Sequence, residues 1–159
     1  MPPPKLPQDS TQLDTWREGI SSHSPEETIA LAKNLARLLP ENTTLGLYGD
    51  LGSGKTTFVR GLASAWAITT PVTSPTYAIF TIHDGPQRQL IHMDAYRLNA
   101  PSESDSLVLW DLLREPWVLV VEWPEKLGDR LPEKHWALTL TCNNEDTRHL
   151  KLTHCNTCP

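Results

Sequence analysis

Apolar residues recur at intervals of three and four in three segments of the chain, which is the spacing of an amphipathic helix. The first segment follows Ser24, Pro25 and Glu27, a combination typical of a helix N-terminus. The serine can cap the helix, the proline suits its first turn, and the glutamate completes a capping box. Pro40 ends the run. The spacing predicts helices over residues 24–39, 55–67 and 102–114.

Other apolar runs have the spacing of β-strands. Residues 117–121 are apolar without interruption, which indicates a strand buried on both faces. Asp84-Gly85 is a hairpin signal between two further runs, and residues 143–146 separate the last two runs as a closing hairpin. Strands are predicted over residues 11–17 (a short edge strand), 44–48, 77–83, 89–93, 117–121, 135–141 and 149–153.

The order of these elements predicts an α/β fold. Helices and strands alternate early and strands dominate late, so we expect three layers around a mixed, mainly parallel sheet with a C-terminal antiparallel hairpin. The 159 residues, 38% of them hydrophobic, are enough for one domain with a buried core. We expect a disordered, proline-rich lead-in over residues 1–9, a single domain over residues 10–154 and a frayed tail over residues 155–159.

The charge balance argues against a protein that binds nucleic acid alone. The formal net charge is −5, and the sequence has no Lys/Arg cluster that would neutralise phosphates. A partner protein that holds the nucleic acid is compatible with this charge. The chain has no apolar run of membrane-spanning length and no secretory signal at its N-terminus, so we expect a cytoplasmic domain that does not enter a membrane.

The three cysteines predict reduced thiols, because their number is odd and no signal peptide precedes them. Cys155 and Cys158, next to His154, have the spacing of metal ligands, but no second pair accompanies them. We therefore expect inert thiols, with a metal site as the alternative.

A glycine loop carries the clearest chemical signal. Residues 49–56, Gly-Asp-Leu-Gly-Ser-Gly-Lys-Thr, match the P-loop pattern G-x-x-x-x-G-K-[ST] between a predicted strand and a predicted helix. Its glycines allow the backbone to wrap around phosphate oxygens, while its amides and the helix N-terminus attract the anion. Lys55 can reach the β- and γ-phosphates, and the Thr56 hydroxyl suits Mg²⁺. The predicted nucleotide-binding residues here are Gly49, Asp50, Leu51, Gly52, Ser53, Gly54, Lys55, Thr56 and Thr57.

Two carboxylates follow apolar strands, where ligands bind in open α/β sheets. Glu122 follows residues 118–121 and is predicted to complete the Mg²⁺ site with Thr56; the alternative is a carboxylate exposed at a strand end. Asp94 follows residues 90–93 and is predicted to orient or deprotonate the attacking water; the alternative is a local cap. Ser74 and Thr76 flank Pro75 and suit a γ-phosphate sensor, unless they only form a rigid turn.

Four motifs in this order resemble the TsaE (YjeE) family. They are GDLGSGKTTF-x-RG at residues 49–61, SPTY at 74–77, D-x-YRL at 94–98 and VEWP at 121–124. The resemblance covers most of residues 24–148. It implies a P-loop NTPase-like fold and an ATPase that acts in making threonylcarbamoyladenosine next to the anticodon of tRNA. It also implies catalytic roles for Asp94, Glu122 and Thr76, and suggests that Trp123 and Arg148 contact the base.

The resemblance further implies Mg²⁺-dependent ATP binding and weak hydrolysis unless partner subunits are present. The implied partners are TsaD-like and TsaB-like proteins, so that tRNA is reached only through the complex. The sequence has no Asn-Lys-x-Asp segment for guanine, which favours ATP over GTP. Two other functions stay open: a P-loop small-molecule kinase, although no arginine-rich lid is evident, and a nucleotide-gated binding subunit that needs no turnover.

Overall fold

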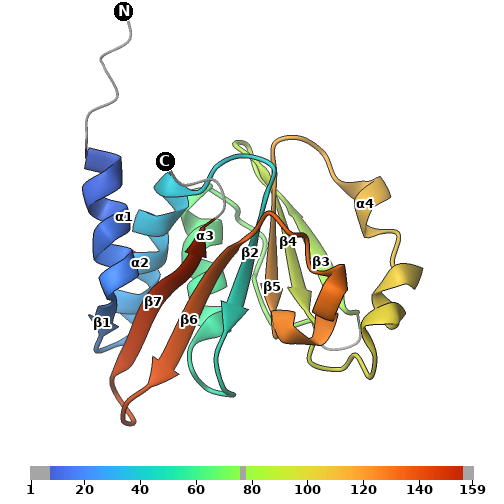
Figure 1. The fold of residues 1–159 in the computed structure, drawn as a ribbon. Helices are drawn as coiled ribbons and strands as arrows, with labels where there is room; N and C mark the ends of the chain where they lie inside the picture. Colours follow the sequence, from blue (N-terminus) through green and yellow to red (C-terminus); the bar gives the residue numbers. More distant parts are fainter. Residues whose placement is uncertain (1–7, 76–77, 156–159) are drawn as a thin grey trace, which may run out of the picture.

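The described part of the chain, residues 8–75 and 78–155 of the computed structural model, forms one seven-stranded sheet (Figure 1). The strand order is β1-β7-β6-β2-β5-β4-β3. The central strands β6, β2, β5 and β4 are parallel. At one edge β3 pairs antiparallel with β4, and at the other β7 pairs antiparallel with both β6 and β1. The strands are β1 (Ile20–Ser22), β2 (Thr43–Tyr48), β3 (Phe80–Asp84), β4 (Gln89–Asp94), β5 (Trp117–Glu122), β6 (Trp136–Cys142) and β7 (Arg148–Cys155).

Helical segments cover both faces of this sheet and make the expected three layers. The longer helices α1 (Gln8–Glu18), α2 (Pro25–Leu38) and α3 (Lys55–Ala65) pack on one face. The other face carries the shorter segments η1 (Pro101–Ser106), α4 (Leu109–Leu112) and η2 (Pro124–Arg130). Alternate residues of β5 enter the two hydrophobic cores, Val118 and Val120 on the α-helical side and Leu119 and Val121 on the other. The predicted mixed sheet, its hairpin and the doubly buried strand are thereby confirmed.

The helix predicted from its capping residues begins where the sequence placed it. Ser24 has an extended backbone, and its Oγ accepts a hydrogen bond from the amide of Glu27 at 3.1 Å. Pro25 occupies the first turn, and the Glu27 carboxylate accepts from the amide of His23 at 2.7 Å. The bond from Ser24 satisfies an amide that the first turn of a helix otherwise leaves unpaired, and the bond from Glu27 ties the residue before the cap to the helix.

The edge strand predicted over residues 11–17 is wrong, because this segment lies in helix α1. Leu13 and Trp16 are both buried, at 4% and 3% exposure, and the Trp16 ring packs edge-on against Phe58 with 6.4 Å between centroids. Residues three apart share one face of a helix but point to opposite faces of a strand. The structure adds the short strand β1, which the sequence did not predict, as the edge next to β7.

The single helix predicted over residues 102–114 is also wrong. The segment contains η1, a two-residue link of which Leu107 is extended, and the one-turn helix α4. The Ser104 hydroxyl donates to the carbonyl of Pro101 at 2.7 Å, a local bond that competes with helix formation. Leu107, at the extended end of η1, and Leu109, the first residue of α4, both pack into the core on this face.

The chain ends differ in part from the predictions. Helix α1 starts at Gln8, inside the expected lead-in, whose first seven residues lie outside the described ones. Cys142 is a free, exposed thiol, but Cys155 at the end of β7 is disulfide-bonded, so the expectation of reduced thiols is wrong for that residue. Cys158 is outside the described residues. No helix in the described part of the chain is long and apolar enough to cross a bilayer.

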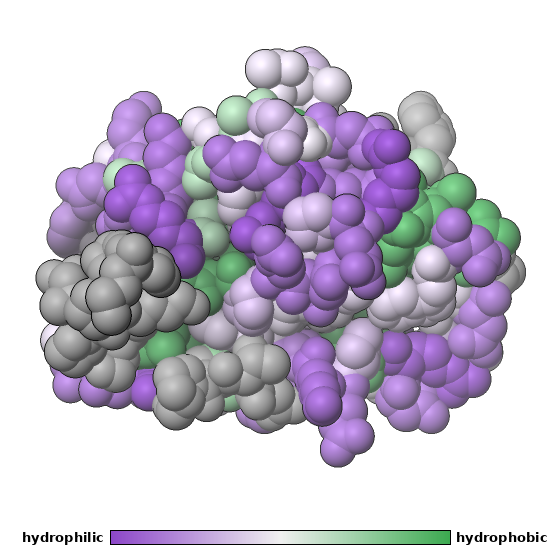
Figure 2. Space-filling view, turned by 90° about the horizontal axis from the view of Figure 1, so that it is seen from above, coloured by the Kyte–Doolittle hydropathy of each residue, from purple (hydrophilic) through white to green (hydrophobic). Residues whose placement is uncertain are grey.

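Figure 2 views the molecule from the side opposite to the carboxyl ends of the parallel strands, and most of that face is hydrophilic. Hydrophobic colour gathers on the side where α4 lies in Figure 1. The exposed large apolar side chains of this region are Val108, Trp110 and Leu112, and we call them the α4 patch.

Candidate functional site

The loop between β2 and α3 has the geometry of a phosphate cradle. It leaves the carboxyl end of β2 at Gly49 and enters α3 through Gly54, whose backbone is left-handed with φ 98°. No side chain caps the N-terminus of α3. The first amides of this helix therefore keep their hydrogen-bonding capacity for an anion, which the helix dipole also favours.

The Lys55 ammonium lies inside this loop. The side chain is buried, at 5% exposure, and Nζ donates to the carbonyls of Gly49 at 2.6 Å and Asp50 at 2.9 Å. Nζ also lies 4.3 Å from the centroid of the Trp123 ring. Burial lowers the pKa of Lys55, while the nearby carboxylates of Glu122 and Asp94 act in the opposite direction. The cation is thus placed where a phosphate oxygen can replace the loop carbonyls as its partner.

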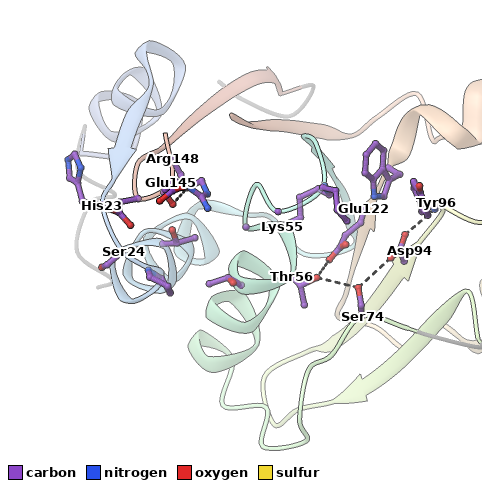
Figure 3. A pocket seen from close by; sticks show the side chains of 18 residues that line it. His23, Ser24, Lys55, Thr56, Ser74, Asp94, Tyr96, Glu122, Glu145 and Arg148 are labelled. Atoms are coloured by element: carbon purple, nitrogen blue, oxygen red, sulfur yellow. Dashed lines mark hydrogen bonds between the residues drawn. The ribbon is translucent and has the colours of Figure 1, made fainter. Parts of the chain in front are cut away.

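Four polar side chains meet beside the lysine, at the carboxyl ends of β4 and β5 (Figure 3). The Thr56 hydroxyl donates to Glu122 Oε1 at 2.8 Å and lies 3.4 Å from the Ser74 hydroxyl. Ser74 in turn donates to Asp94 Oδ2 at 3.4 Å. Asp94 and Glu122 are direct partners in the parallel β4–β5 register, so their side chains leave the same face of the sheet.

This donor set fits a magnesium ion. Mg²⁺ in phosphate-handling proteins is held by one or two carboxylates, a hydroxyl, waters and the phosphate oxygens of the ligand. The Thr56 hydroxyl and the Glu122 carboxylate already lie within hydrogen-bond distance of each other. Among residues 8–75 and 78–155, no three His, Cys, Asp or Glu side chains form a metal cage of their own.

A cavity of about 670 Å³ joins these groups to the other side of the loop. The N-terminus of α2, with Ser24 and Thr28, and the β6–β7 turn, with Arg148, line this second side. Arg148 Nη1 donates to the carbonyls of residues 144 and 145, which fixes it to its own turn. Arg148 and Tyr96 lie on opposite sides of Lys55 (Figure 3), and the Trp123 ring packs on Tyr96 with 5.0 Å between centroids.

The cavity brings together most of the residues that the sequence singled out. Those that line it are Leu51, Gly52, Gly54, Lys55, Thr56, Thr57, Ser74, Asp94, Glu122, Trp123 and Arg148. Gly49, Asp50 and Ser53 belong to the loop without lining the cavity. Thr76, the predicted sensor, lies outside the described residues. Trp123 and Arg148, both expected at the base, have different surroundings: the Trp123 ring packs on Tyr96, whereas Arg148 lies across Lys55 from Tyr96 (Figure 3).

One residue of the site escaped the sequence reasoning. His92 on β4 is fully buried, and its Nε2 lies 2.9 Å from Glu122 Oε1. The spacing of the six histidines in the sequence forms no ligand-like cluster and predicts solvated or core residues. The available signal was a polar residue two positions before Asp94 in an otherwise apolar strand, which places it on the same face of β4.

Comparison with known proteins identifies the family. A family model described as threonylcarbamoyl adenosine biosynthesis protein TsaE matches residues 22–150. The chain is 36% identical over 130 residues to the tRNA threonylcarbamoyladenosine biosynthesis protein TsaE of Bacillus subtilis (strain 168), with 82% of this chain and 81% of that protein covered. It is 32% identical over 129 residues to the protein of the same name from Treponema pallidum (strain Nichols), with 81% and 95% covered.

A solved structure agrees with this relationship. The crystal structure of Bacillus subtilis YdiB superposes with a TM-score of 0.69 at 32% sequence identity, covering 84% of this chain and 82% of that chain. The matched region holds the glycine loop, both carboxylates and the strands that position them. The chain therefore belongs to the TsaE family of proteins of tRNA threonylcarbamoyladenosine biosynthesis.

Proposed function

We propose that this protein binds ATP with Mg²⁺ and hydrolyses it as a subunit of the machinery that makes threonylcarbamoyladenosine next to the anticodon of tRNA. The observation that carries the proposal is the 2.8 Å bond between Thr56 and Glu122 at the end of the glycine loop. A P-loop threonine and a strand-end carboxylate in contact are the two protein groups that hold the metal of a nucleoside triphosphate.

Each group has a role that follows from its position. The loop amides and Lys55 bind the β- and γ-phosphates, and Thr56 and Glu122 hold the ion directly or through water. When bound, Mg²⁺ neutralises charge that develops on the phosphates. Asp94 orients the attacking water and receives its proton, and Ser74, between Thr56 and Asp94, senses the γ-phosphate. The base lies on the Arg148 side of the cavity, next to the N-terminus of α2.

We propose further that turnover serves a complex with TsaD-like and TsaB-like subunits in the cytoplasm, and that these partners hold the tRNA. The net charge of −5 supports this division of labour, because a protein that grips RNA by itself needs excess positive charge. Exposed apolar side chains support partner contact: Leu51, 87% exposed, and Tyr96, 55% exposed, line the nucleotide cavity.

Equilibrium binding of ATP in the presence of Mg²⁺ tests the nucleotide site. Replacing Lys55 by alanine removes charge-assisted bonds to phosphate, and we expect the affinity to fall by at least about tenfold. The matched control is Lys134→Ala, which removes an exposed lysine outside the cavity and should bind like the wild type. Wild-type affinity in Lys55→Ala would contradict the proposal.

Turnover and pathway are tested separately. Phosphate release should need no acceptor, should rise with TsaD and TsaB subunits, and should be lost in Asp94→Ala while ATP binding persists. Phosphorylation of a metabolite would instead indicate a kinase.

Cells depleted of the protein should lack threonylcarbamoyladenosine in digested tRNA, and Asp94→Ala should not restore it. Restoration by that variant would show that nucleotide binding without turnover is sufficient.

A further inference from the structure

A buried polar row runs beneath the metal-binding edge of the sheet. Glu122 on β5 is 3% exposed and is hydrogen-bonded to His92 on β4, which is fully buried. His83 on the next strand, β3, is 4% exposed, and its Nδ1 lies 2.7 Å from the Thr70 hydroxyl. These residues occupy a core that is otherwise apolar on this face of β4 and β5.

Packing alone gives a poor account of His92. Its Nδ1 is buried and has no hydrogen-bond partner among the described residues, which destabilises the folded state because the nitrogen has lost its hydrogen bond to water. An apolar side chain of similar size would fill the same space without burying an unpaired polar atom. The one hydrogen bond recorded for the ring within the described residues goes to Glu122, so this bond is the interaction that distinguishes histidine from an apolar residue here.

The geometry of the hydrogen bond between His92 and Glu122 shows how His92 can orient the carboxylate. Glu122 Oε1 accepts from the Thr56 hydroxyl at 2.8 Å and lies 2.9 Å from His92 Nε2. A carboxylate only accepts, so the ring carries its hydrogen on Nε2 and donates. Within the described residues, both bonds converge on Oε1, which leaves Oε2 open to another ligand. Because His92 lies below Glu122 in the core, its bond persists when Thr56 turns its hydroxyl to a metal.

We propose that His92 is a positioning residue that holds the Glu122 carboxylate in its metal-binding orientation. The proposal rests on the proposed function, since Glu122 needs a metal to orient toward. It assigns His92 no contact with nucleotide. Buried partners of this kind fix the rotamer of a metal-binding carboxylate, and their loss commonly costs about 10–100-fold in metal affinity or activity.

The test measures metal-dependent nucleotide binding, not turnover. A fluorescent ATP analogue is titrated into wild-type protein and His92→Leu, first with EDTA and then with increasing Mg²⁺. We expect His92→Leu to keep the EDTA affinity and to need at least about tenfold more Mg²⁺ to reach half of the metal-dependent gain. His92→Gln, whose amide can donate near the Nε2 position, should recover most of the loss. His92→Met provides the same test if the leucine variant does not fold.

His83→Leu is the matched control, because it removes a buried histidine from the neighbouring strand without touching Glu122. It should keep the wild-type Mg²⁺ requirement, and thermal unfolding checks that the variants are folded. A folded His92→Leu or His92→Met with the wild-type requirement, or an equal rise in His83→Leu, would overturn the role of His92 alone. A wild-type protein that binds no nucleotide would overturn the proposed function and this inference with it.

Discussion

Gly49 shows how a single residue can fix the start of a binding loop. A Cβ at this position would come within 3.0 Å of the carbonyl oxygen of Leu140 on β6 and of the Ser53 hydroxyl. The loop thus leaves β2 in contact with the neighbouring strand, and only the absence of a side chain permits that approach. Gly52, at the tip of the loop, differs: it has φ +79° but open space where a Cβ would lie.

Replacing Gly49 or Gly52 by alanine should therefore lower the stability by different amounts. Gly49→Ala must displace backbone and should lower the free energy of unfolding by about 3 kcal/mol, whereas Gly52→Ala carries only the strain of a left-handed backbone, about 1 kcal/mol. Urea unfolding of both variants measures the difference. Equal losses would mean that the β2–β6 contact at Gly49 relaxes without cost.

Among the elements, helix α3 is placed by its packing against α2 as well as by the loop before it. Gly61 faces α2, and a Cβ there would lie 2.5 Å from the Cβ of Ala32 and 2.8 Å from the carbonyl oxygen of Ile29. The two helices consequently approach closely along one side. Ser24, at the N-terminus of α2, and Thr28 line one wall of the cavity, and Lys55 and Thr56 of α3 line another. We therefore expect the α2–α3 contact to influence the width of the cavity.

We expect Gly61→Ala to push α2 and α3 apart. The overpacking should lower the free energy of unfolding by about 1–3 kcal/mol, and ATP should bind more weakly because the two walls of the cavity separate. Ser64→Ala, at an exposed position of the same helix, is the control and should change neither quantity. Denaturant unfolding measures the free energy of unfolding, and ATP titration measures the affinity. Unchanged ATP affinity in Gly61→Ala would show that the width of the cavity does not depend on the contact between α2 and α3.

For the molecule as a whole, the buried side chain of His83 connects stability to pH. Burial, and to a smaller extent the proximity of His92, lowers the pKa of His83 below its ordinary value of 6.5. Below pH 6.5 the unfolded chain takes up a proton at His83 that the folded protein does not. The contribution of His83 to the free energy of unfolding is therefore fully present above pH 6.5, and it is lost as the pH falls from 6.5 toward the lowered pKa of the folded protein.

Acid should accordingly destabilise the wild type more than a variant without this histidine. Between about pH 7.5 and pH 5.5, the free energy of unfolding of the wild type should fall further than that of His83→Leu. Urea unfolding at several pH values provides the comparison. Parallel pH profiles for the two proteins would show that His83 takes up its proton equally well in the folded state.

Local signals predicted the parts of the molecule that depend on neighbours in sequence. The Ser24 cap, the helix after the glycine loop, the doubly buried β5 and the closing hairpin were all predicted in this way. Predictions failed where distant contacts chose the conformation. Residues 11–17 are helical, with Trp16 packed against Phe58. The helix predicted over residues 102–114 is interrupted at residues 107–108, and Leu107 and Leu109 on either side of Val108 pack into the same core.

The sequence by itself predicted the strand, glycine loop and helix around residues 49–56 and the side chains that we propose bind phosphate and metal, because a P-loop is a contiguous motif whose strand and helix follow from local periodicity. Only the tertiary structure decided which distant groups meet. The parallel pairing of β4 with β5 sets Asp94 beside Glu122 and brings His92 under that carboxylate, and strand order cannot be read from local spacing. The strand order also sets Trp123 apart from Arg148, because Trp123 follows β5, Arg148 begins β7, and β2 and β6 lie between these two strands.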